Sequence, residues 1–341
     1  MGAALVAAPA VGARSPHGRS KAQTPTARVV KAANAFLATL TDDQRKKELY
    51  AFDDGKQRVR WSNFPGGFVP RGGLQLRAMT PPQREAVMAL LQTALSPKGY
   101  AKVRAIMHAD DVFKRTEGAR DESLFGSDLY SIAILGAPSE TKPWMLMYGG
   151  HHLAINLTVV GERGVLTPTL TGAQPSAFVE NGTTVRPLGA ESDKGLALLN
   201  GLDAAQRKAA ILNYEVSDLM LGPGQDGRTI VPEGVRVSTM TAKQRALLLD
   251  LVAEWAGIVN DAQARLRLRE IEAGLGDTYF AWSGPTTAKP GENIAAYYRI
   301  QGPKLVIEFA PQSMRGDDPR FHVHTMYRDP TNDYGRGLTK G

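Results

Sequence analysis

Four helix starts that share one local pattern constrain this chain more than any other feature. In each, a Thr or Asp stands where an N-cap accepts the free amides of the first turn, and a Gln follows three residues later, as in a capping box. Apolar residues at helical spacing follow the second and fourth starts, over residues 85–95 and 246–259. The four starts are LTDDQR at 40–45, MTPPQR at 79–84, LDAAQR at 202–207 and MTAKQR at 240–245.

The four starts form two ordered pairs with nearly equal spacing, and a second alignment follows each pair. Residues 129–159 and 278–311 both read as a strand, a Gly/Pro-rich loop, a strand, a tight glycine turn and another strand. We therefore expect an α+β fold made of two diverged copies, each of two helices followed by a small antiparallel sheet, related by a pseudo-twofold. The expected repeats are 30–190 and 191–341, after a signal remnant and linker at 1–29.

The N-terminal residues MGAALVAAPAVGARSP are rich in Ala and Val and carry small side chains at Val11 and Ala13. These positions suit the −3 and −1 sites of signal-peptidase cleavage, which predicts a mature chain that begins near Arg14. We expect a secreted or periplasmic protein. A disordered Ala-rich tail is the alternative interpretation.

Composition excludes several classes of function. The chain has 341 residues and no cysteine, which removes disulfides, thiolate metal sites and Cys nucleophiles. No apolar run reaches the roughly 18 residues of a membrane span. The net charge of +7 is scattered among acids and forms no basic run with interleaved aromatics, so we expect a small-molecule or extracellular substrate and no nucleic acid.

Most of the histidines gather in two clusters, His151-His152 and His322-x-His324. Strict alternation along a strand from 151 to 160 puts His151 on the apolar face and His152, with Asn156, on the other. Alternation in 321–328 puts His322, His324 and Arg328 on one face. By the alignment of the copies, Glu308 is equivalent to Asn156.

Two imidazoles in an HxH strand lie about 7 Å apart at Cα, near enough to bind one ion. Glu308 can add a carboxylate ligand from the preceding strand, and His152 can enter from the other copy. We therefore expect His152, Glu308, His322 and His324 to hold one divalent ion. Zinc, iron, copper and manganese all accept imidazole and carboxylate ligands, so the ligand set does not identify the ion. In the competing interpretations the HxH is an ordinary polar pair, and Glu308 pairs with an arginine.

Several strings resemble one known family. They are GAPSETKPWMLMYGGHHLAINL, TPTLTGAQP, YYRIQGPKLVIEF and HVHTMYRDPTNDYG, and the family is the bacterial and fungal domain of unknown function 3500. The resemblance covers most of the chain beyond its N-terminal segment. It implies that certain residues occupy motif positions without assigning them roles: His151, His152, Glu308, His322, His324, Arg328 and Asp333.

Three functions compete on these residues. The first is an exported metal-dependent enzyme, hydrolytic or oxidative, in which Arg328 neutralises developing negative charge and Asp333 orients a histidine. The second is a metal-free enzyme in which His322 or His324 is a general base oriented by Glu308 or Asp333. The third is a non-catalytic binding protein with an aromatic groove formed by Trp61, Trp144, Trp282, Tyr297, Tyr298, Tyr327 and Tyr334.

Overall fold

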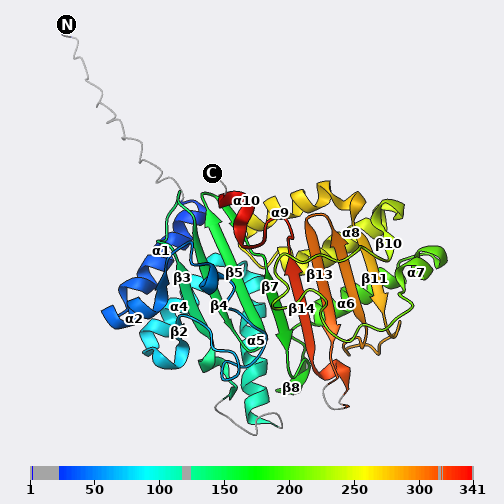
Figure 1. Cartoon of the computed structure of the whole chain (residues 1–341), viewed down its shortest axis with the longest axis horizontal. Helices are drawn as coiled ribbons and strands as arrows, with labels where there is room; N and C mark the ends of the chain where they lie inside the picture. Colours follow the sequence, from blue (N-terminus) through cyan, green and yellow to red (C-terminus); the bar gives the residue numbers. More distant parts are fainter. Residues whose placement is uncertain (1, 3–22, 117–123, 314–315, 317, 340–341) are drawn as a thin grey trace.

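A single mixed sheet runs across the protein in the computed structural model, which describes residues 2, 23–116, 124–313, 316 and 318–339 (Figure 1). The strand order is β1-β3-β4-β5-β7-β14-β13-β12-β11-β10, with β2 beside β3 and β6 beside β5. Every pairing is antiparallel except β1 with β3. The strands of the sheet are β1 (Leu49–Tyr50), β2 (Leu74–Gln75), β3 (Ser131–Leu135), β4 (Trp144–Gly150), β5 (Leu153–Val160), β6 (Arg163–Val165), β7 (Thr169–Ala173), β10 (Val235–Arg236), β11 (Tyr279–Ser283), β12 (Tyr297–Gly302), β13 (Leu305–Pro311) and β14 (Val323–Arg328).

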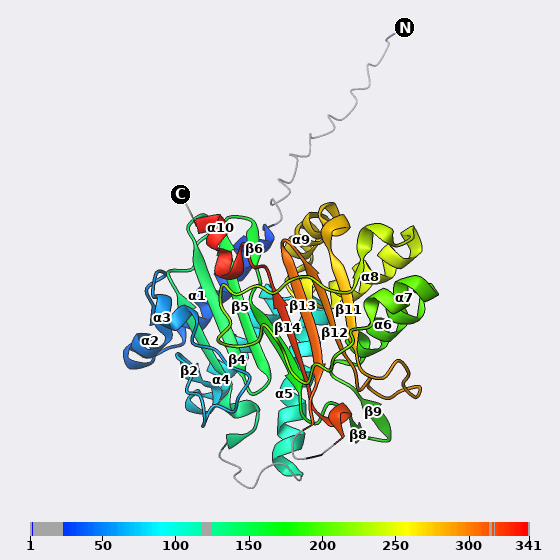
Figure 2. The same cartoon turned by 45° about the vertical axis from the view of Figure 1, so that its right-hand side comes forward.

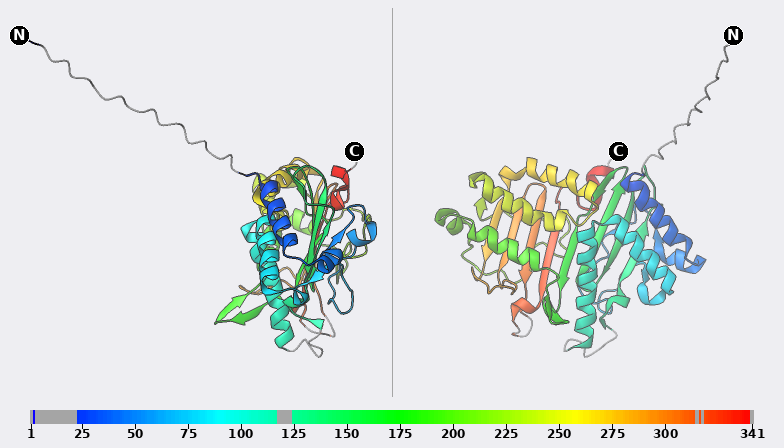
Figure 3. Two further views of the ribbon diagram at one scale, coloured as in Figure 1. Left: turned by 90° about the vertical axis from the view of Figure 1, so that its left-hand side faces the viewer. Right: turned by 180° about the vertical axis from the view of Figure 1, so that it is seen from behind.

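The longer helices cover one face of this sheet, and a separate hairpin of β8 (Phe178–Glu180) and β9 (Thr183–Val185) projects at one end (Figures 2 and 3). Among the described residues, no helix combines the length and the apolarity that crossing a membrane requires. The helices are α1 (Pro25–Ala38), α2 (Asp42–Glu48), α3 (Gly55–Arg58), α4 (Pro81–Ala94), α5 (Pro97–Arg115), α6 (Gly189–Asn200), α7 (Ala204–Ala210), α8 (Ala242–Ala256), α9 (Asp261–Ala273) and α10 (Arg336–Thr339). Short 3₁₀ helices are η1 (Leu76–Ala78), η3 (Ser127–Leu129), η4 (Val237–Thr239), η5 (Leu275–Asp277), η6 (Pro319–Phe321) and η7 (Asp333–Gly335).

The four predicted helix starts are confirmed as the beginnings of α2, α4, α7 and α8. At each, the Gln side chain accepts a hydrogen bond from the backbone N–H of the N-cap residue. The glutamines also bond to one another in pairs, Gln44 with Gln83 and Gln206 with Gln244. The repeated Gln therefore joins two helix starts in each half of the chain.

The two faces of the sheet differ in chemistry, as alternation predicts. Leu153, Ile155 and Leu157 point into the large apolar core beneath the helices, whereas Ala154 belongs to a small cluster on the opposite face. Polar side chains, among them Asn156 and Glu308, are buried on this opposite face. Three segments cover the sheet there: residues 51–73, residues 212–234 and the chain beyond β14. A polar, loop-covered face is where a site can form without opening the main core.

The two halves of the chain contribute neighbouring parts of the sheet and meet where β7 pairs with β14. Helices and strands are both present, so the α+β class is confirmed. The expected boundaries fall within helices, with residue 30 in α1 and residues 190 and 191 in α6. Each half also has more than the two expected helices, because α1 and α5 in the first half and α6 and α9 in the second were not among the predicted helix starts.

The hairpin turn of the first half lies two residues later in the chain than predicted. Gly149 and Gly150 are paired strand residues, opposite Ala154 and Leu153, and the turn itself is His151-His152. A Cβ on Gly150 would lie 2.5 Å from the ring of Tyr130, so this glycine serves close packing. The two histidines consequently stand at the tip of a hairpin and not within a strand.

Candidate functional site

Three buried imidazoles meet on the loop-covered side of the sheet. His322 Nε2 lies 2.7 Å from His152 Nε2 and 2.9 Å from His324 Nε2. One nitrogen from each ring falls within 4.8 Å of the others. We call His152, His322 and His324 the three-histidine cluster. It joins the tip of the β4–β5 hairpin to the start of β14, next to the junction of the two halves.

Backbone contacts fix His152 in the cluster. Its φ of 60° is in the left-handed region, which a non-glycine residue adopts only where the surroundings hold it. The N–H of His152 donates to the Asn63 carbonyl at 3.0 Å, and its carbonyl accepts from Gly172 N–H at 2.8 Å. A Cβ on Gly172 would lie 3.2 Å from the His152 Cβ and 3.3 Å from His324 Cδ2. The missing side chain at Gly172 therefore leaves room for the imidazoles.

The surroundings favour the neutral form of two of these imidazoles, His152 and His322. Burial, reinforced by the charges of neighbouring histidines, lowers the pKa of His322 to about 2 and holds the pKa of His152 well below its usual range. Two Nε2 atoms at 2.7 Å can share at most one proton, so at least one of the two directs a lone pair at the other ring. Neutral nitrogens with converging lone pairs are the form in which imidazole binds metals.

A carboxylate that sequence reasoning missed lies behind the cluster. Asp218 Oδ1 is 3.5 Å from His324 Nδ1, the nitrogen that points away from the other rings. Proximity to His324 contributes to the lowered pKa of Asp218, although burial acts in the opposite direction. A carboxylate on the far nitrogen of a ligating imidazole orients the ring. Asp218 lies in an irregular loop about 100 residues from His324, so no local pattern signals it.

The neighbouring histidine has a different role from the cluster. His151 Nδ1 lies 2.7 Å from Asp110 Oδ1, and the Tyr130 hydroxyl donates to the His151 carbonyl. The His151 ring packs against the ring of His152 at a tilt of 30°, with 3.7 Å between their centroids. His151 is thus a buried histidine paired with a carboxylate from α5, and it supports the hairpin tip.

Glu308 does not join the cluster. Its two carboxylate oxygens accept hydrogen bonds from the N–H groups of Met220 and Leu221, and the Tyr297 hydroxyl donates to Oε1 at 2.7 Å. Although Glu308 shares a face with His324, it is opposite Met326 in the register, one pleat further along β14. Glu308 therefore anchors the loop that carries Asp218, and the expectation that it provides a ligand is corrected.

Arg328 and Asp333 also lie away from the imidazoles. Arg328 Nε donates to Asp333 Oδ2 at 2.9 Å, and its other nitrogens bond to Leu221, Gln225 and Asp226. Four residues of strand separate Arg328 from His324, or about 13 Å at Cα. The pair holds the segment after β14 against the sheet, so neither residue reaches the cluster as a catalytic group.

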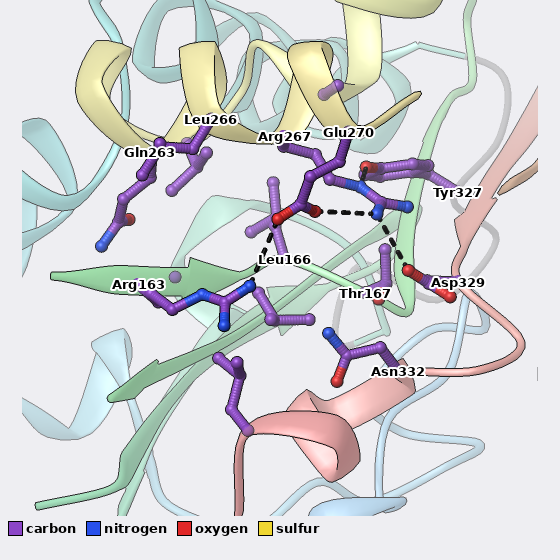
Figure 4. A pocket seen from close by; sticks show the side chains of 15 residues that line it. Arg163, Leu166, Thr167, Gln263, Leu266, Arg267, Glu270, Tyr327, Asp329 and Asn332 are labelled. Carbon is purple, nitrogen blue, oxygen red and sulfur yellow. Dashed lines mark hydrogen bonds and ion pairs between the residues drawn. The ribbon is translucent and has the colours of Figure 1, made fainter. Parts of the chain in front are cut away.

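The aromatic residues proposed to line a groove are all buried, and Trp282, Tyr298 and Phe309 stack within the core. A pocket does lie at the far end of β14, between β6 and α9 (Figure 4). Its charged groups neutralise one another, because Arg267 bonds to Asp329 at 2.9 Å and Arg163 to Glu270 at 3.2 Å. This pocket is distinct from the three-histidine cluster.

Comparison with known protein families assigns the chain to one family. No curated protein and no solved structure matches the chain. One family profile matches residues 22–336, nearly the full length. The chain therefore belongs to the family described as Protein of unknown function (DUF3500).

Proposed function

We propose that the protein is a metal-dependent enzyme whose three-histidine cluster holds one divalent ion. The observation that carries this proposal is the convergence of three buried imidazole nitrogens on one point. A tetrahedral ion with bonds of 2.0–2.1 Å needs ligand nitrogens about 3.3 Å apart, so the rings move apart by roughly half an ångström to admit it. Three protein ligands leave one position for water or substrate.

The donor set narrows the choice of ion. With Glu308 engaged elsewhere, the part of the chain that the structure describes offers three imidazoles and no carboxylate as ligands in the cluster. Imidazole suits zinc, copper and iron, whereas manganese favours oxygen ligands. We propose zinc. A zinc ion held by three histidines would lower the pKa of a water molecule bound at its fourth position, and this would supply hydrolytic chemistry. Redox chemistry on copper or iron is the oxidative alternative.

Metal analysis of protein purified without a histidine tag tests the proposal. We expect about one zinc per chain, and His152→Ala, His322→Ala and His324→Ala should each lower metal affinity by at least about tenfold without unfolding the chain. His108→Ala is the matched control, because His108 lies on α5 and pairs with Glu180 outside the cluster. Metal-free wild-type protein after reconstitution with zinc, copper and iron would contradict the proposal.

A metal-free acid–base enzyme remains the second candidate, with different residues from those expected. His151 and Asp110 form a histidine–carboxylate pair at 2.7 Å, the arrangement that orients a general base. Activity that survives complete metal removal and is lost in Asp110→Asn would favour this candidate over the metal enzyme.

We further infer that the chain arose by internal duplication. Supporting observations are the paired Gln networks, the closing pairs Gly150–Leu153 and Gly302–Leu305, and a glycine with positive φ before both β2 and β10. An experimental structure in which the halves do not superpose over these elements would contradict the inference.

We also propose that the protein is exported and acts on an extracellular substrate. The cleavage signal at Val11 and Ala13 lies outside the described residues, so N-terminal sequencing of the native protein is the measurement that checks it.

A further inference from the structure

We propose that the three-histidine cluster takes a small carboxylate with an apolar, aromatic body as its ligand. The inference rests on the proposed metal site and names the chemistry that the site recognises. Its basis is the set of groups around the cluster: an amide, an arginine that has no carboxylate partner among the described residues, and an exposed aromatic ring.

The charges near the cluster favour an anion. Three imidazoles leave the charge of a divalent ion uncompensated, and Asp218 approaches only the far nitrogen of His324. Arg71 places a positive charge close to the cluster, because its Nη2 donates at 2.8 Å to the carbonyl of Gly150, two residues before His152. Within the described residues no carboxylate lies at ion-pair distance from Arg71, which donates instead to the carbonyls of Ser62, Phe64 and Gly150.

Asn63 supplies a hydrogen-bond donor at the cluster. Its side-chain Nδ2 is 3.4 Å from His324 Nε2, on the ion-binding side of that ring. Its backbone carbonyl is also bonded to His152 N–H, which fixes the residue beside two cluster histidines. One metal position and one amide donor match the two oxygens of a carboxylate. A phosphate would require more donors, and the N–H groups of Arg71 are mostly committed to carbonyls.

Phe64 supplies the apolar surface. Its carbonyl shares the donor Arg71 Nη2 with the Gly150 carbonyl, so the backbone of Phe64 lies beside the hairpin that ends in His152. The Phe64 side chain is 55% exposed. An exposed ring that follows directly after Asn63 is suited to cover an aromatic or aliphatic group attached to the carboxylate.

Ligand titration of the full-length, cobalt-substituted protein tests the proposal, since visible absorption of Co²⁺ reports a change at its open position. The probes are acetate, benzoate and benzyl alcohol. We expect benzoate to bind about tenfold more tightly than acetate, because burial of the ring against Phe64 adds roughly that factor. Benzyl alcohol, which lacks the charge, should bind at least tenfold more weakly than benzoate.

Variants separate the two contacts. Asn63→Ala should weaken acetate and benzoate alike by about fivefold, and Asn63→Asp should weaken them further through charge repulsion. Phe64→Ala should reduce benzoate affinity to that of acetate and leave acetate unchanged. Leu266→Ala is the control, because Leu266 is an exposed apolar residue on α9 that lines the pocket at the far end of β14.

The outcomes distinguish this inference from the proposed function. Failure to bind Co²⁺ would overturn both. Stoichiometric Co²⁺ with equal affinities for acetate and benzoate, or with no effect of Phe64→Ala, would overturn the ligand class alone. The Asn63→Ala and Phe64→Ala variants should keep the Co²⁺ content of the wild-type protein, so that a change in affinity reports on the ligand contacts and not on loss of the metal.

Discussion

At the scale of single residues, Glu48 is a buried carboxyl group with incomplete partners. It ends α2, has no exposed surface, and accepts one hydrogen bond from Leu74 N–H at 3.2 Å, whereas Oε1 has no partner in the described structure. Burial raises its pKa well above the usual range. The protonated acid is therefore the form that the fold favours, and ionisation costs stability.

Glu48→Gln should stabilise the protein in a pH-dependent way. The pKa of Glu48 is higher in the folded state than in the unfolded state, where it is about 4. The contribution of this acid to the free energy of unfolding is therefore fully present below about pH 4 and is lost as the pH rises through the folded-state pKa. The variant should gain about 1–3 kcal/mol at pH 8 and almost nothing at pH 4. Thermal unfolding at both pH values measures this, with the exposed Glu85→Gln as control. An equal gain at pH 4 would contradict the explanation.

At the scale of elements, the glutamine pairs fasten helix starts together. Gln244 accepts from Thr241 N–H at 2.7 Å and donates to the Gly201 carbonyl and to Gln206. Gln83 makes the corresponding bonds to Thr80, Thr39 and Gln44. The two networks are built alike although the residues around them differ.

Gln244→Ala and Gln83→Ala should destabilise the protein by similar amounts. Each loses a capping bond and leaves a helix-end carbonyl without its donor, at a cost of about 1–3 kcal/mol. Urea denaturation measures the loss, and the exposed Lys243→Ala, one residue before Gln244, should change stability by less than about 0.5 kcal/mol. A loss in only one of the two glutamine variants would show that the networks do not contribute equally.

At the scale of the whole molecule, the two halves share one sheet. β7 pairs with β14 over five residue pairs, and an additional bridge joins Leu95 to Val259 near the ends of α4 and α8. Apolar residues of both halves form a single core. Neither half can be removed without exposing a long strand edge and part of that core.

The protein should accordingly unfold in one cooperative transition. Far-UV circular dichroism follows the helices, and tryptophan fluorescence follows Trp61 and Trp144 in the first half and Trp255 and Trp282 in the second. Both signals should give the same urea midpoint. Two separated midpoints would indicate that the halves fold independently.

The sequence by itself determined the features that depend on neighbouring residues. The capping boxes, the alternation that turns His322 and His324 to one face, and the α+β class follow from local hydrogen bonding and from the period of helices and strands. The family match also follows from sequence alone. These properties need no knowledge of which segments meet.

Only the tertiary structure decided which side chains share a site. His152 joins His322 across 170 residues, Asp218 approaches His324 from an irregular loop, and Glu308 turns to backbone amides instead of the imidazoles. Alternation gives the face of a strand but not its register, and a shift of one pleat, about 7 Å, separates a ligand from a loop anchor. The register follows from packing of the whole sheet, to which residues far apart in the chain contribute.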